Sequence, residues 1–266
     1  MPRPRDQTWP GTPWPRGLRA RLRHAGRGAL FYVLLLGFAL LCLGWSLPAA
    51  LLARLLPASA GAPLGQRAIG RGFRLYLSTL RATGMLRCDL SALQGLRDEP
   101  GLVIAPNHPS LLDAVLLTSC LPRAVCIAKS AIWDNPLLGG GMRLAAYVRN
   151  DAPLPMIRDA AAALRAGRQV VIFPEGTRTP RGSTLGPVSR SFALMARQAG
   201  APVQTVIIET DSPYLRKGWS PFRRPPLPLR FTVRLGQRFS PGAGGDARQL
   251  SEAVEHHLRQ SLGGPS

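Results

Sequence analysis

Two short segments of the chain combine residue types that can carry out acid–base chemistry. The first holds His108 and Asp113, which are separated by four residues, and the second holds Glu175 and Arg178 around a Pro-Glu-Gly turn. A histidine can take a proton from a hydroxyl near neutral pH, and a carboxylate can fix the tautomer of its ring. An arginine offers a planar fork that suits phosphate. The sequence therefore offers a general base with an orienting acid, and a turn suited to an anion.

The segment around His108 also has an ordinary structural explanation. Residues 102–105 predict a strand and residues 111–119 predict a helix, so His108 lies in the turn between them. Pro109 fits the first position of that helix, where its missing N–H costs nothing. A histidine in such a turn can fold back toward Asp113, although residues five apart within a helix do not share a face. The helix dipole alone also favours an aspartate there, so both explanations stay open for this pair.

The second segment, Phe173 to Arg178, follows a predicted strand over residues 169–173. Carboxyl ends of strands are where open α/β sheets place their sites. Glu175 and Gly176 predict a tight turn, and the structural alternative is a polar loop with Pro and Gly as turn residues. Because two such turns follow strands in one domain, behind an apolar N-terminal segment, the two segments together favour a catalytic site.

Short apolar runs alternate with helical stretches from about residue 98 onward. The predicted strands cover residues 102–105, 124–128, 169–173, 203–208 and 229–235, and the predicted helices cover residues 111–119, 137–145, 155–166, 189–199 and 246–262. Strands and helices that take turns predict an α/β fold with a mixed, largely parallel sheet flanked by helices.

The N-terminal region predicts a membrane anchor. Residues 1–28 are rich in Pro and Arg and predict a disordered basic arm. Residues 29–53 carry no charge, and they exceed the roughly 20 residues that cross a hydrocarbon core. Because Pro48 divides this run, the anchor, residues 29–56, is either one spanning helix or a re-entrant segment. Arginines on both sides of the run favour the re-entrant form, which places both flanks in the cytoplasm.

The rest of the chain, residues 57–266, is the predicted catalytic domain. It opens with an amphipathic helix over residues 65–85, whose basic side could lie on a membrane or simply face solvent.

The net charge of +20 and the pI of 11.6 predict an acidic partner. No nucleic-acid-binding motif is present in the sequence, whereas an apolar run beside an Arg-rich flank is typical of a membrane surface. The four cysteines match no metal or redox spacing and predict buried free thiols.

With these motifs, the sequence resembles the glycerolipid acyltransferase family, which includes 1-acylglycerol-3-phosphate acyltransferases. The first family motif is a His and an Asp separated by four residues, as in His108 and Asp113, and the third is matched by Phe173 to Arg178. The second block contains a Lys, a Pro-Gly turn and an Arg, and it is matched in order by Lys129, Pro136, Gly139 and Arg149. Ala145 and Ala146 stand where the family often has a further glycine. The resemblance covers about residues 85–235.

The resemblance implies an O-acyltransferase that moves a fatty acyl chain from acyl-CoA or acyl carrier protein to the hydroxyl of a lysophospholipid. The implied acceptor is 1-acylglycerol-3-phosphate, which becomes phosphatidic acid. His108 would be the general base and Asp113 its orienting partner. The residues expected to bind substrate are Glu175, Gly176, Thr177 and Arg178 at the headgroup, Arg149 at a phosphate, and Lys129 at the oxyanion.

The resemblance implies no metal and no cofactor besides the thioester donor. The expected partners are the lipid bilayer, the lysophospholipid acceptor and the acyl donor, with no nucleic acid. The expected place is the bacterial cytoplasmic membrane, with the catalytic domain on its cytoplasmic face.

Other functions stay open beside this one. The acceptor could be a non-glycerol lipid such as lyso-ornithine lipid, because Thr210 to Phe239 is unlike the simplest family members. A thioester hydrolase would leave the segment from Glu175 to Arg178 without an obvious purpose. The intact His108 and Asp113 disfavour a catalytically inactive membrane-binding protein.

Overall fold

The computed structural model describes residues 17–220, 223–242 and 246–263. Within them, seven strands form one sheet in the order β1-β7-β6-β2-β5-β3-β4. The strands are β1 (Leu86–Asp89), β2 (Val103–Pro106), β3 (Ala124–Lys129), β4 (Val148–Asn150), β5 (Gln169–Val171), β6 (Val203–Glu209) and β7 (Leu229–Phe239). All neighbouring strands are parallel except β6 and β7, which are antiparallel. The expected mixed, largely parallel sheet is therefore confirmed.

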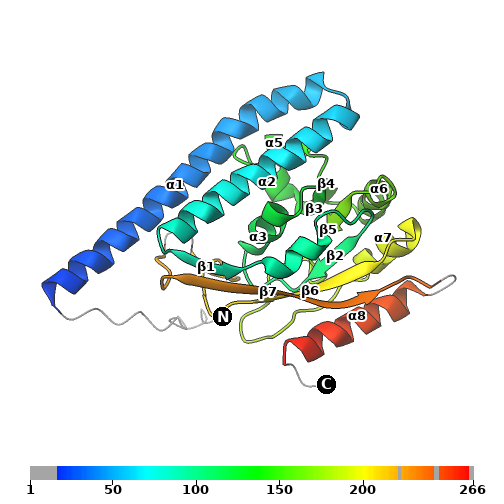
Figure 1. The fold of residues 1–266 in the computed structure, drawn as a ribbon. Helices are drawn as coiled ribbons and strands as arrows, with labels where there is room; N and C mark the ends of the chain where they lie inside the picture. The colour runs from blue at the N-terminus through cyan, green and yellow to red at the C-terminus, as the bar shows by residue number, and fades with distance from the viewer. Residues whose placement is uncertain (1–16, 221–222, 243–245, 264–266) are drawn as a thin grey trace, which may run out of the picture.

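Helices flank this sheet. They are α1 (Leu18–Leu55), α2 (Ala58–Ala82), η1 (Ser91–Leu96), α3 (Asp113–Cys120), α4 (Ser130–Trp133), α5 (Gly139–Leu144), α6 (Pro153–Arg165), α7 (Ser191–Ala199) and α8 (Ala247–Ser261). Figure 1 shows α8 on the side of the sheet opposite to α1 and α2. The central strands β2 and β5 are buried at every position, as expected for short apolar runs covered on both faces. The four cysteines are free thiols, of which Cys126 is buried and the other three are half-buried.

The N-terminal region is a helical hairpin in which α1 and α2 pack against each other (Figure 1). The expected basic arm over residues 1–28 needs correction. Residues 1–16 lie outside the described residues, but α1 begins at Leu18. Residues 18–23 consist of Leu, Arg and Ala, which are strong helix formers, so the helix begins well before the apolar run. Pro48 lies inside α1 and does not end it.

One side of α1 presents exposed leucines along its C-terminal half. Their spacing of four or seven residues places them on one side of the helix: Leu36, Leu40, Leu47, Leu51 and Leu55. Ser46 and Ala49, which face the domain, are buried. The part of α1 from Arg21 to Leu55 is long and apolar enough to cross a membrane. The hairpin therefore covers the domain with one side and leaves an apolar side uncovered.

Helix α1 reaches the domain through a close contact with α5. The Gly140 N–H donates to Ser46 Oγ at 3.0 Å, and a Cβ at Gly140 would overlap the Ser46 carbonyl oxygen. Helix α2 is fixed nearby, because the Gln66 side-chain amide donates to the Ala145 carbonyl at 3.0 Å. The hairpin is thus attached at two points to the segment between β3 and β4, and the contact at Gly140 leaves room only for a glycine.

Candidate active site

The order of the sheet brings the two sequence motifs together. Strands β2 and β5 are parallel neighbours, so both end at the same edge of the sheet. His108 lies in the turn that follows β2, and Glu175 lies in the turn that follows β5. The carboxyl edge of a parallel sheet is the usual place for a binding site in this fold class.

His108 and Asp113 form a buried pair in the turn after β2. His108 Nδ1 lies 2.9 Å from Asp113 Oδ2, and the Ser110 N–H donates to the same oxygen at 2.8 Å. Burial raises the pKa of the Asp113 carboxyl, while the hydrogen bonds from His108 and Ser110 oppose that shift. Because a carboxylate only accepts, Nδ1 carries the proton in this arrangement and Nε2 keeps its lone pair. The geometry is therefore suited to a general base.

The His108 ring is also held from the turn after β5. It stacks on the Phe173 ring with a centroid separation of 3.7 Å and an angle of 18° between the planes. The His108 side chain keeps only 10% of its surface exposed, whereas the Asp113 side chain is fully buried. A ring held by one stacking contact and one charge-assisted hydrogen bond has few alternative positions, and this preorganises it for proton transfer.

The start of the following helix differs from the expectation. Pro109 does not occupy the first helical position, because α3 begins at Asp113. The intervening turn is stabilised by side-chain bonds: Ser110 Oγ accepts from Leu112 N–H at 3.2 Å, and Asp113 Oδ2 accepts from Ser110 N–H. Short polar side chains that bond to nearby backbone groups compete with helix formation. The later start leaves His108 in a wider turn, from which its ring reaches back to Asp113.

Glu175 is buried and bonded to three donors within the protein. Its Oε1 accepts from the His108 N–H at 2.9 Å and from Thr179 Oγ1 at 2.8 Å, and its Oε2 accepts from the Gly186 N–H at 2.6 Å. The Thr179 N–H in turn donates to the His108 carbonyl at 2.8 Å. Glu175 therefore ties the turn after β5 to the backbone of His108. Its expected contact with an acceptor headgroup stays a prediction.

A prediction follows for Gly186, whose place beside Glu175 leaves no room for a side chain. A Cβ at Gly186 would lie 2.7 Å from Glu175 Oε2 and 2.9 Å from Pro180 Cδ. We expect Gly186→Ala to lower the free energy of unfolding by about 1–3 kcal/mol, the usual cost of overpacking. Thermal unfolding in detergent measures this. Gly95→Ala is the matched control, since a methyl group at that position would meet no atom within 4 Å and little change is expected. Equal stability of the two variants would contradict the prediction.

The remaining residues of the second motif shape the same turn. The Gly176 N–H donates to the Phe173 carbonyl at 2.9 Å, and Gly176 has a φ of 61°, so the tight turn that the sequence predicts is present. Thr177 is half-buried within it. Arg178 Nη1 donates to the carbonyls of Leu215 and Arg216 at 2.8 and 3.2 Å. Arg178 therefore fixes the segment that follows β6.

The two residues of the second block lie at the edge strands. Lys129 ends β3 and is exposed, and its backbone pairs with the neighbouring strand β4. Arg149 lies on β4, with its guanidinium 2.6 Å from the Asp151 carboxylate and 3.3 Å from the Asp134 carboxylate. In the sheet order, β5 separates both β3 and β4 from β2, the strand that leads to His108. The substrate contacts expected of Lys129 and Arg149 stay predictions.

Several residues that position the site were not singled out from the sequence. The Asn107 side chain exchanges two hydrogen bonds with the Ile208 backbone, at 2.9 and 2.7 Å, and so fixes the end of β2 to β6. Ser110 Oγ donates to the Tyr214 carbonyl at 2.9 Å. The position of Asn107 directly before His108 was the feature of the sequence that could have marked it as a positioning residue. The backbone partners carried no signal, since any residue type supplies them.

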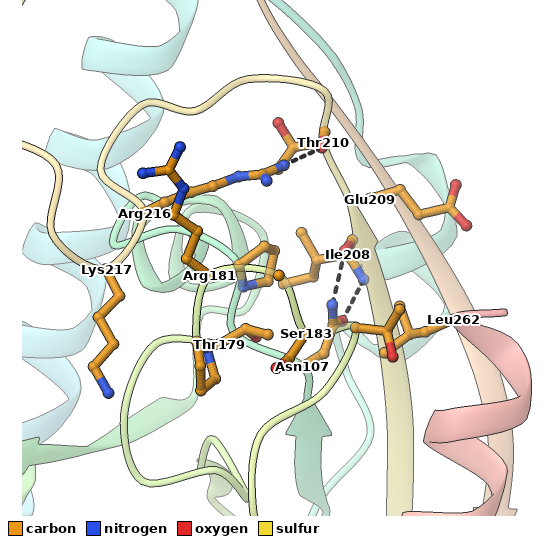
Figure 2. A pocket seen from close by; sticks show the side chains of 14 residues that line it. Asn107, Thr179, Arg181, Ser183, Ile208, Glu209, Thr210, Arg216, Lys217 and Leu262 are labelled. Atoms are coloured by element: carbon orange, nitrogen blue, oxygen red, sulfur yellow. Dashed lines mark hydrogen bonds between the residues drawn. The ribbon is translucent and has the colours of Figure 1, made fainter. Parts of the chain in front are cut away.

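A cavity of about 260 Å³ lies beside this turn (Figure 2). Asn107 and Pro109 from the His108 turn and Thr179 from the following loop form part of its wall. Arg181, Arg216 and Lys217 line it as well.

Comparison with known proteins finds relatives that are described as acyltransferases. A family model described as Acyltransferase matches residues 87–209. A 1-acyl-sn-glycerol-3-phosphate acyltransferase from Cocos nucifera is 30% identical over 159 residues, which is 57% of this chain and 48% of that protein. One from Pseudomonas aeruginosa is 25% identical over 205 residues, 75% of this chain and 77% of that protein. The match therefore spans about half the length of the coconut protein.

The fold has a counterpart among solved structures. The crystal structure of the 1-acyl-sn-glycerophosphate (LPA) acyltransferase PlsC from Thermotoga maritima superimposes with a TM-score of 0.64. The two chains are 17% identical, and the match covers 89% of this chain and 95% of the other. At this identity the likeness establishes the fold, which includes the long apolar helix before the sheet.

Proposed function

We propose that this chain, which belongs to the glycerolipid acyltransferase family, transfers a fatty acyl group from a thioester to the free hydroxyl of 1-acylglycerol-3-phosphate, forming phosphatidic acid. One observation carries the proposal: His108 and Asp113 pair at 2.9 Å in a turn at the carboxyl edge of the sheet. A hydroxyl that attacks a thioester needs a base, and this pair is arranged to supply one. The proposed acceptor, 1-acylglycerol-3-phosphate, is taken from the names of the relatives.

In the proposed reaction, His108 Nε2 removes the proton from the acceptor hydroxyl as its oxygen attacks the thioester carbonyl carbon. Asp113 holds Nδ1 and stabilises the imidazolium that forms. The C–O bond forms, the carbonyl oxygen becomes an oxyanion, and the C–S bond then breaks. The thiolate leaves and takes the proton from His108, so no acyl-enzyme forms. No metal or cofactor takes part, and the donor is acyl-CoA or acyl carrier protein.

The other predicted site residues keep supporting roles in this proposal. Lys129 stabilises the developing oxyanion, and Arg149 adds a contact to phosphate. Glu175, Gly176, Thr177 and Arg178 contact the acceptor headgroup, and the internal hydrogen bonds of Glu175 and Arg178 hold that turn in place. General base catalysis typically supplies about 10²–10⁴-fold, so the rest of the rate comes from positioning of donor and acceptor.

The helical hairpin is proposed to attach the enzyme to the bacterial cytoplasmic membrane, with the catalytic domain on the cytoplasmic face. The exposed leucine side of α1 supports this, since an uncovered apolar stripe of this length is stabilised by burial in lipid. Helix α1 runs unbroken through Pro48, so a return of the chain to the same membrane face would occur through α2 and not by a bend within residues 29–56. Labelling of an engineered cysteine on α8 from outside intact cells would contradict the cytoplasmic placement.

A second acceptor class is favoured by the segment after β6. The carbonyls of Tyr214 and Leu215 accept from Ser110 Oγ and from the Leu111 N–H, so this segment forms part of the wall at the His108 turn. It lies in the region in which this chain differs from the simplest family members. A non-glycerol lysolipid, such as lyso-ornithine lipid, is therefore the alternative acceptor for the same chemistry.

The experiment that tests the proposed function is an acyl-transfer assay with a panel of acceptors. Purified enzyme in vesicles receives labelled acyl-CoA or acyl carrier protein and one lysolipid at a time. Phosphatidic acid from 1-acylglycerol-3-phosphate is the expected product. Turnover only with a lysolipid that lacks the glycerol phosphate would select the alternative acceptor. Free fatty acid as the sole product would overturn both in favour of hydrolysis.

A further inference from the structure

Helix α1 enters the core of the domain through the ring of Phe31. Phe31 is fully buried, whereas Leu30 and Val33 beside it on the helix are exposed. Its ring meets the ring of Tyr214 edge-to-face, with a centroid separation of 5.3 Å and an angle of 82° between the planes. Tyr214 lies on the segment after β6 and is only 2% exposed. An edge-to-face pair of buried rings is directional, so it fixes the position of Tyr214 relative to α1.

The backbone of the same segment holds the turn of the proposed general base. The Tyr214 carbonyl accepts from Ser110 Oγ at 2.9 Å, and the Leu215 carbonyl accepts from the Leu111 N–H at 3.2 Å. Ser110 and Leu111 both follow His108 in that turn. Tyr214 therefore contacts α1 through its ring and the turn through its main chain.

Ser110 connects this contact to the carboxylate that orients the His108 ring. Its N–H donates to Asp113 Oδ2 at 2.8 Å, and His108 Nδ1 lies 2.9 Å from the same oxygen. Ser110 is fully buried, and it bonds to Asp113 with its main chain and to Tyr214 with its hydroxyl. Because Asp113 Oδ1 has no hydrogen-bond partner in the part of the chain that the structure describes, the contacts of Oδ2 position this carboxylate. A shift of Tyr214 would therefore be passed to Asp113 and to the His108 ring.

The backbone at Leu215 depends on contacts from outside its own segment. Leu215 has a φ of 57°, a left-handed conformation that is unfavourable for a residue with a side chain. Such a conformation persists where the surrounding contacts hold it. On the side of the site, the Arg178 guanidinium donates to the Leu215 carbonyl at 2.8 Å. On the side of α1, the Phe31 ring packs on Tyr214. Removing the Phe31 ring would leave a strained segment with fewer contacts to hold the turn.

We propose that Phe31 and Tyr214 are positioning residues for the general base, so that α1 completes the active site as well as attaching the enzyme to a membrane. This assignment rests on the proposed function, because it acts through His108. The path consists of the ring contact, the bond from Ser110 Oγ to the Tyr214 carbonyl, and the bond from the Ser110 N–H to Asp113. Neither ring is required to contact a substrate.

Phe31→Ala tests this path. We expect kcat to fall by about tenfold to 10²-fold, since a small misplacement of a catalytic group can cost that much, while the KM for the acceptor changes little. Acyl transfer in vesicles measures both, with whichever lysolipid the wild type acylates. Phe38→Ala is the matched control on the same helix, because its ring packs on Phe73 and Tyr76 of α2. The control should keep the kcat of the wild type, although the Tm should fall in both variants.

Two further readouts separate positioning from a loss of stability. In an Asp113→Asn background, Phe31→Ala should lower kcat little further, because both changes act on the same catalytic pair. Tyr214→Ala should resemble Phe31→Ala, and Tyr214→Phe, which keeps the ring, should rescue that loss. If Phe31→Ala fails to fold, Phe31→Leu takes its place, because leucine fills much of the same space without an aromatic edge.

An unchanged kcat in Phe31→Ala, or a fall no larger than that in Phe38→Ala, overturns the positioning role of α1. Losses of kcat that multiply with that of Asp113→Asn, or an effect confined to the KM, overturn it as well. Wild-type enzyme that acylates no lysolipid would instead refute the proposed function itself.

Discussion

Replacing His108 with alanine is expected to lower kcat by about 10²–10⁴-fold, the contribution that a positioned general base usually makes. The main chain around it should persist. The Glu175 and Thr179 contacts use the His108 N–H and carbonyl, which alanine retains. The lost contacts are the stacking on Phe173 and the bond to Asp113. Labelled phosphatidic acid formation measures the activity, and circular dichroism and thermal unfolding measure the fold. His256→Ala, on the exposed side of α8, is the matched control.

Asp113→Asn tests whether Asp113 orients the His108 ring or only stabilises the fold. An asparagine oxygen can still accept from Nδ1, but its amide would occupy the position of Asp113 Oδ1, which is buried and has no hydrogen-bond partner among the described residues. The imidazolium would also lose its counter-charge. We expect this variant to lose a factor comparable to that of His108→Ala. The double variant should lose no more than the larger single effect, because the two residues act as one unit. If the losses of kcat multiplied in the double variant, or if His108→Ala kept full activity, the proposal that His108 is the general base would be contradicted.

The fold was largely predictable because the central strands are buried on both faces. Such strands are short continuous apolar runs, and β2, β5 and β6 lie where those runs predict them. The short elements β1 and η1 were not predicted. Strand β1 has the sequence Leu-Arg-Cys-Asp and exists because it pairs with β7, far along the chain. Elements that depend on such long-range pairing carry little local signal.

The site was predictable where side chains act and hidden where backbone groups act. His108, Asp113 and Glu175 could be named from residue type and spacing. The acceptors and donors that position them are mostly main-chain groups, such as the Gly186 N–H and the Leu215 carbonyl, which no residue type marks. The cavity beside the His108 turn was hidden for a different reason, because Arg181 and Arg216 come together only through the sheet order and the loop contacts. In an arginine-rich chain, type alone does not distinguish them.

Glu175→Ala is expected to have the second large effect, through stability as well as rate. It leaves the His108 N–H, the Gly186 N–H and the Thr179 hydroxyl without their acceptor. At about 1–3 kcal/mol for each unsatisfied buried group, the loss should reach about 3 kcal/mol or more. For a domain of this size this corresponds to a fall in Tm of roughly 6–12 °C. The kcat should fall as well, because the backbone that carries His108, the proposed general base, loses its anchor.

Glu175→Gln distinguishes this anchoring role from direct contact with the acceptor. The amide oxygen of glutamine can still accept from the His108 N–H and the Thr179 hydroxyl, but its NH₂ group would face the Gly186 N–H, which is also a donor. Stability and kcat should therefore lie between those of the wild type and Glu175→Ala, with the KM for 1-acylglycerol-3-phosphate little changed. Glu252→Gln, an exposed glutamate on α8, controls for loss of charge. If Glu175 also contacts the headgroup, both Glu175 variants would raise the KM for 1-acylglycerol-3-phosphate in addition to lowering the Tm. The three donors around its carboxylate support the anchoring role.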